Sequence, residues 1–134
     1  MNHETIRKAT EIITAKRLDC ILALIDLDGY PTASTITVSK ADGIKWITFV
    51  VNKNSNKLKR INQNNHASVC FASLGDINPL YNITLVGKIE EITDPKIKEE
   101  MWWDDCKNHF SGPNDPNYCV IKFTTERYNL FIEW

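Results

Sequence analysis

The sequence lacks the long apolar segments of membrane and secreted proteins. Its longest apolar run, Ile21–Ile25, is far too short to cross a bilayer, which takes about 20 such residues. The N-terminal stretch MNHETIRKATEII is polar, whereas a secretory signal needs an apolar segment of its own. We therefore expect a cytoplasmic protein with no membrane partner.

Metal-binding and hydrolytic motifs are also missing. The four cysteines stand far apart, with no CxxC pair: Cys20, Cys70, Cys106 and Cys119. The three histidines are equally scattered: His3, His66 and His109. No spacing typical of a zinc site is present, and neither is a GxSxG nucleophile motif. We expect free thiols, no metal and no hydrolytic dyad, so any redox chemistry would come from a bound cofactor.

An excess of charge of either sign is absent as well. Sixteen basic residues oppose seventeen acidic ones, so the formal net charge is −1. A nucleic-acid-binding barrel of the OB type would have this size, but it needs a basic groove that a balanced chain does not suggest. We therefore expect no nucleic-acid partner, and any charged ligand must be held by local groups.

The length and composition are those of one ordinary globular domain. The chain has 134 residues, of which 43% are hydrophobic and 25% charged. A chain of this size can bury roughly two-thirds of its unfolded surface without disulfides or a structural metal. We predict a single domain over residues 1–134.

Seven extended segments are predicted from alternating apolar residues and turn signals. The first three, joined by short turns at Asp28-Gly29 and Asp42-Gly43, predict a meander. The predicted strands are Asp19–Asp26, Ala33–Val38, Ile44–Val51, Ala67–Ala72, Asn82–Ile92, Tyr118–Phe123 and Tyr128–Ile132. Antiparallel sheets of this length tend to close into a small barrel, which removes exposed edges.

Three short helices are predicted between the strands. Glu4–Arg17 is amphipathic, Ser55 begins a helix that ends near Asn64, and Thr93-Asp94-Pro95 begins one that runs to about His109. Residues 75–79 are predicted to be loop. The predicted class is mainly β (α+β), an antiparallel β-barrel of about six or seven strands with short peripheral helices.

Two segments are candidates for ligand binding. In Val50–Arg60 a strand ends and a helix begins at Ser55, so unpaired N–H groups and Lys57 could hold a phosphate. The plain alternative, a helix cap with solvated lysines, fits that segment better when it is read alone. The strand Thr32–Thr37 is rich in hydroxyl groups that could bind a polar ring or a phosphate, although such strands are also ordinary β surface.

Five motifs occur in the same order as in a known superfamily. They are Asp28-Gly29-Tyr30-Pro31, Trp46–Lys57 with Ser55-Asn56-Lys57, Asn64–Phe71, Leu85–Glu90 with Asp94, and Trp103 with Gly112–Pro116. The sequence resembles the pyridoxamine 5′-phosphate oxidase-like, FMN-binding split-barrel superfamily, and within it the general stress protein 26 group. The resemblance covers Asp26–Phe131, nearly the whole chain, and it implies that the barrel is split.

The resemblance implies two strands along the flavin. Ser34, Thr35 and Ile36 would lie along the isoalloxazine ring and the ribityl chain. Val50 and Val51 would end the strand on the phosphate side.

It also implies a phosphate site and a shared cofactor. Ser55 and Lys57 would hold the FMN phosphate, and Asn82 would reach the flavin of the other subunit. FMN would therefore bind at a homodimer interface, where each site needs two chains.

The sequence departs from the family pattern at two of these positions. Ser34 stands where an arginine is common, and Val51 where a threonine is common. Losing both removes one charged and one neutral hydrogen bond to the phosphate, worth roughly 1.5–3 and 0.5–1.5 kcal/mol. The Arg-x-His segment of true pyridoxamine phosphate oxidases is also missing, so vitamin B6 oxidation is not expected.

The resemblance thus implies an FMN-dependent oxidoreductase that acts on an unknown small molecule. The alternative is a non-catalytic protein that binds or senses flavin or another small ligand.

Overall fold

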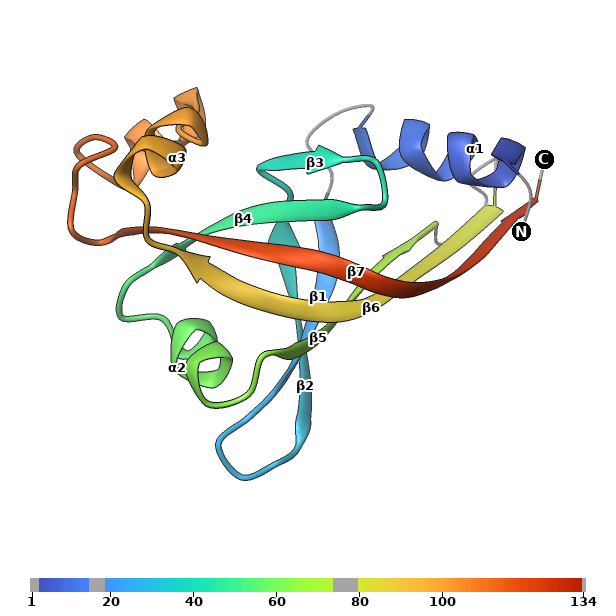
Figure 1. Cartoon of the computed structure of the whole chain (residues 1–134), viewed down its shortest axis with the longest axis horizontal. Helices are drawn as coiled ribbons and strands as arrows, with labels where there is room; N and C mark the ends of the chain where they lie inside the picture. Colours follow the sequence, from blue (N-terminus) through green and yellow to red (C-terminus); the bar gives the residue numbers. More distant parts are fainter. Residues whose placement is uncertain (1–2, 15–18, 74–79, 134) are drawn as a thin grey trace.

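The computed structural model describes residues 3–14, 19–73 and 80–133, which form one curled antiparallel sheet with short helices (Figure 1). The strands follow the order β2-β1-β5-β6-β7-β4-β3. They are β1 (Asp19–Ile25), β2 (Pro31–Thr37), β3 (Lys40–Asp42), β4 (Trp46–Asn52), β5 (His66–Ala72), β6 (Leu80–Ile92) and β7 (Tyr118–Glu133). The helices are α1 (His3–Thr14), α2 (Asn56–Gln63), α3 (Pro95–Glu100) and the 3₁₀ helix η1 (Asp104–Asn108). The predicted class, an antiparallel split barrel with short helices, is confirmed.

The barrel is split between its two edge strands. No pairing joins β2 to β3 within the residues that the structure describes. β1 and β2 run across β4, β6 and β7 in Figure 1, because the sheet curls strongly. β3 has only three residues and pairs with Trp46–Thr48, so the rest of β4 has no strand on that side. Two free strand edges therefore face the split.

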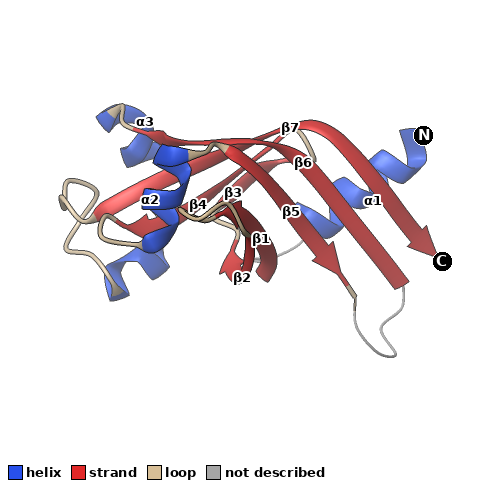
Figure 2. Ribbon diagram, turned by 90° about the horizontal axis from the view of Figure 1, so that it is seen from below, coloured by secondary structure: helices blue, strands red, loops and turns tan. Residues whose placement is uncertain are grey.

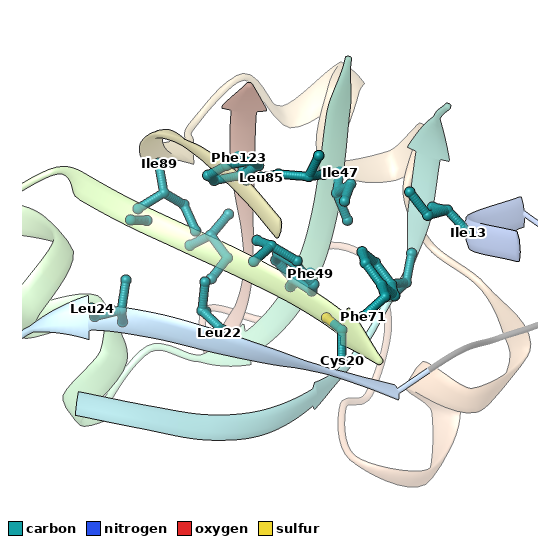
Figure 3. Close-up of a cluster of buried hydrophobic side chains, with 14 of the residues drawn as sticks. Ile13, Cys20, Leu22, Leu24, Ile47, Phe49, Phe71, Leu85, Ile89 and Phe123 are labelled. Atoms are coloured by element: carbon teal, nitrogen blue, oxygen red, sulfur yellow. The ribbon is translucent and has the colours of Figure 1, made fainter. Parts of the chain in front are cut away.

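A hydrophobic core fills the concave side of the sheet (Figure 3). Phe49, Phe71 and Phe123 are fully buried there, and α1 adds Ala9 and Ile13. Burying a large apolar side chain contributes about 1.5–3 kcal/mol, so this shared core holds the strands together. In the described part of the chain, no helix is long and apolar enough to span a membrane.

The predicted meander is wrong beyond its first hairpin. β1 and β2 pair as expected, but β2 does not pair with β4. Instead β4 pairs with β3 and, along its whole length, with β7. The ladder with β7 covers the whole of β4 from Trp46 to Asn52, whereas β3 pairs only with Trp46–Thr48, so the distant strand satisfies most of the backbone hydrogen bonds of β4.

Two further segments differ from their predictions. The helix expected up to His109 is divided into α3 and η1, because Trp103 has an extended backbone (φ −145°, ψ 167°) between them. The last two predicted strands form one strand, β7, that continues through a bulge. The predicted loop over residues 75–79 and the end of the first predicted helix lie outside the described residues.

The bulge depends on Gly87. Val86 pairs with Arg127 but Gly87 pairs with Thr125, so Glu126 is the extra residue. A Cβ on Gly87 would lie 2.0 Å from the carbonyl oxygen of Thr124. Only glycine lets these two backbones approach so closely.

We expect Gly87→Ala to destabilise the fold by about 2–4 kcal/mol, since the clash is with backbone that cannot move alone. Urea unfolding followed by circular dichroism measures this loss. Gly112→Ala is the matched control, because a Cβ there meets nothing within 4 Å. Equal midpoints for the two variants would contradict the structural role of Gly87.

Candidate functional site

A cavity of about 400 Å³ lies at the split. β2 and β4 form one side of it, and residues 103–110 form the other. Its lining residues are Ile36, Thr37, Val50, Val51, Asn52, Trp103, Asp105, Cys106, His109 and Phe110. Cavities of roughly 300–1,000 Å³ are typical of small-molecule sites, so this volume suits a ring-sized ligand.

The floor of the cavity is apolar. Ile36 packs against the main core, and Val51 belongs to it. Val50 faces the other side of β4 and packs against a second buried cluster that includes Phe110 and Val120. The floor is therefore rigid, because both faces of β4 are packed at this point.

Tyr118 fixes the opposite wall to β7. Its ring makes edge-on contacts with Trp102 and Phe110, at centroid distances of 5.1 and 5.5 Å. Its hydroxyl donates a hydrogen bond to the carbonyl oxygen of Lys98 (2.7 Å). Burial raises the pKa of Tyr118 strongly, so the phenol keeps its proton and remains a donor. Cys106 is also buried in this wall.

Asp105 and His109 complete the cavity, and sequence reasoning missed both. Both residues are exposed. Both fall on the predicted helix that runs to about His109, and nothing in the sequence marked either as a site residue. The one signal that pointed to this wall was Trp103, which the family motif includes.

The start of α2 has the predicted geometry. Ser55 is the N-cap, and its side-chain oxygen accepts a hydrogen bond from the backbone N–H of Lys57 (3.0 Å). Ser55 therefore performs the ordinary capping role, while its own O–H stays available to donate. Lys53 precedes this turn, and Lys59 and Arg60 of α2 line a separate pocket together with Asp26 and Asp28.

The structure brings together three of the eight predicted residues: Ile36, Val50 and Val51 line the cavity. Ser34 and Thr35 are exposed on the same strand as Ile36 but do not line it.

Asn82 lies apart from the cavity, on β6. Its Oδ1 accepts a hydrogen bond from the hydroxyl of Thr84 (3.2 Å) and a weak one from the thiol of Cys70 (3.8 Å). Asn82 therefore takes no part in the cavity of its own chain.

A sequence model of the family described as pyridoxamine 5′-phosphate oxidase matches residues 6–131. This chain belongs to that family.

Solved structures support the family assignment and the general stress protein 26 group. One is a protein from Clostridium acetobutylicum that is 26% identical to this chain, with a TM-score of 0.84. It is described as related to general stress protein 26 of B. subtilis and as a member of the pyridoxinephosphate oxidase family. The match covers 98% of this chain and 90% of that one. General stress protein 26 from Bacillus anthracis gives 18% identity and a TM-score of 0.78, over 97% and 95%.

An FAD-binding protein from Mesorhizobium loti shares the fold, with 18% identity and a TM-score of 0.72, over 96% of this chain and 94% of that one. No curated protein matches the sequence.

The family motif at Gly112–Pro116 forms a turn beside the cavity wall. The carboxylate of Asp115 accepts hydrogen bonds from the backbone N–H groups of Ser111 and Asn117, both at 2.9 Å. The bond from Ser111, followed by that from Asn117, lowers the pKa of Asp115 below its ordinary value of 3.8. The charged carboxylate therefore stabilises this turn.

We expect Asp115→Ala to lower the unfolding midpoint at neutral pH. Because the folded pKa is depressed, the stabilisation is present above about pH 3.8 and is lost as the pH falls through the lower folded value. Thermal unfolding of both proteins between pH 7 and pH 2.5 measures the difference. A difference that stays constant over this range would show that the Asp115 charge does not stabilise the turn.

Proposed function

We propose that this chain binds FMN and acts as a flavin-dependent oxidoreductase on a small molecule in the cytoplasm. The observation that carries the proposal is a separation of charge. The cavity has an apolar floor, and no lysine or arginine is among its described lining residues, whereas Lys53 and Lys57 stand on either side of the Ser55 cap in the sequence. A ligand with an uncharged ring and an anionic tail suits this arrangement, and FMN is such a ligand.

The phosphate is proposed to bind at the start of α2. The N-terminal N–H groups of a helix favour an anion, the Ser55 hydroxyl can donate to it, and Lys57 supplies a charge. Ser34 and Val51, at positions where the family commonly has arginine and threonine, make this phosphate site weaker than usual.

The ring is proposed to lie along β2 and over the floor of the cavity. Ser34, Thr35 and Ile36 would contact the ring and the ribityl chain, with Val50 and Val51 closing the phosphate side. Membership of the family supports this placement, and so does the fold shared with the FAD-binding protein from Mesorhizobium loti. When bound, the flavin would accept and pass on electrons, while the protein orients it and shields it from water.

The alternative is a non-catalytic protein that binds or senses flavin or another small ligand, and the weaker phosphate site that follows from Ser34 also suits a ligand other than FMN. Turnover of purified, flavin-loaded protein with a reductant separates the two functions.

We expect Lys57→Ala to weaken FMN binding by about tenfold or more, while riboflavin binding changes little. A charge-assisted hydrogen bond to phosphate is worth roughly 1.5–3 kcal/mol, and riboflavin lacks the phosphate. Quenching of flavin fluorescence during titration of the protein measures both affinities.

Lys96→Ala is the matched control. Lys96 occupies the same position in α3, where its N–H donates to the capping carboxylate of Asp94, but it lies away from the cavity. No saturation with FMN at high micromolar concentration would refute flavin binding. Equal losses for FMN and riboflavin would refute the phosphate role of Lys57.

The proposed site is shared between two copies of the chain. On the convex side of the sheet, Ile21 pairs with Cys70, and Asn82 pairs with Phe131. Ile21 is 40% exposed and Phe131 53%, which leaves apolar surface uncovered beside Asn82. A second copy that covers this surface would bring Asn82 to the partner's flavin.

We expect the protein to sediment as a dimer at micromolar concentration, and Phe131→Arg to produce monomers that bind FMN more weakly. A stable dimer commonly buries about 2,000 Å² or more, and an arginine in its centre would lose its hydration. Leu27→Arg is the control for sedimentation alone: Leu27 is 55% exposed in the β1–β2 loop, away from this surface but beside Asn56 and Lys59 of α2. A wild-type monomer with full FMN affinity would refute the shared site.

A further inference from the structure

The cavity at the split carries one acidic group. Among its described lining residues Asp105 is the one carboxylate, and none is a lysine or an arginine. A ligand in this cavity therefore meets a negative field from one side and an apolar floor from the other.

The charge of Asp105 is held in place by its own helix. One carboxylate oxygen, Oδ1, accepts a hydrogen bond from the side-chain amide of Asn108 (3.2 Å). The neighbouring cation, Lys107, pairs with Asp104 at 3.5 Å. Lys107 therefore does not pair with Asp105, and the ion pairs found among the described residues do not include Asp105.

The rest of the wall suits a flat heterocycle. Trp103 and Phe110 offer aromatic surface, on which planar rings stack or pack edge-on. His109 has two ring nitrogens that can donate to, or accept from, a polar substituent. The aromatic surface and the hydrogen-bonding groups both suit an aromatic ring that carries a polar substituent.

We propose that Asp105 makes this cavity select heteroaromatic rings by charge: cationic and uncharged rings are accepted, and rings that carry a carboxylate or phosphate are disfavoured. This selection rests on the proposed function, which places the flavin ring in the same cavity, and it describes the class of ring that the cavity itself accepts. Oxidised isoalloxazine is uncharged and satisfies the same condition, while the FMN phosphate stays at α2.

Three pyridines of nearly equal size test this selection: 1-methylnicotinamide, nicotinamide and nicotinate, which are cationic, uncharged and anionic at pH 8. Ligand-observed NMR gives their dissociation constants. The indole N–H signal of Trp103, identified with Trp103→Phe, reports binding in this cavity. An exposed charge pair is worth about 0.2–1 kcal/mol, which corresponds to up to about fivefold in affinity.

We expect affinity to fall from the cation to the anion by about two- to fivefold at each step. Asp105→Asn should bring the three values within about twofold of each other. Asp104→Asn removes the same charge from the adjacent residue, which does not line the cavity, and should preserve the order.

Three outcomes would overturn the proposal. They are equal affinities of the wild type for the three probes, equal effects of Asp105→Asn and Asp104→Asn, and no shift of the Trp103 signal with any probe. FMN titrations of the same samples keep the two proposals apart. Charge selection without FMN binding would refute the proposed function alone, and FMN binding without charge selection would refute the role of Asp105 alone.

Discussion

The cavity at the split exists because β3 is too short to cover β4. β3 pairs only with Trp46–Thr48, so the second half of β4 keeps a free edge that faces the free edge of β2. Unpaired backbone groups at a strand edge need water or a ligand as partners. A longer β3 would fill the gap with another strand, and the apolar floor formed by Val50 and Val51 would then lie inside a closed barrel.

The opposite wall, residues 103–110, is held in place by β7, which lies outside this segment. Tyr118 begins β7, and it contacts Trp102 and Phe110 while its hydroxyl reaches the end of α3. β7 also pairs with β4 along the whole of that strand. One strand thus positions both sides of the cavity. The polar groups of the wall are therefore held at fixed distances from the floor formed by Val50 and Val51.

The fold class, the helix cap at Ser55 and most strands could be predicted because they follow from local patterns. Alternation marks strands, and a serine before a helical run marks a cap. Long-range pairing could not be predicted in this way. The β4–β7 ladder joins segments far apart in sequence, and no local pattern within β4 distinguishes β2 from β7 as its neighbour.

The candidate site could likewise be predicted only in part. Ile36, Val50 and Val51 followed from the resemblance to the family, whereas nothing in the sequence distinguished Asp105 and His109 from the rest of one predicted helix. Their place in the cavity follows from the break at Trp103, which turns one expected helix into two short ones. Neither composition nor periodicity marks that break.

The pairing of β4 with β7 also bears on how the chain folds. The hairpin of β1 and β2 can form locally, but the cavity walls meet only when β7 has docked against β4. When distant segments pair, the chain loses loop-closure entropy before the stabilising contacts form, and such pairing is therefore slow. We therefore expect the walls of the cavity to meet late in folding, so that a molecule bound between them would stabilise the last contacts to form.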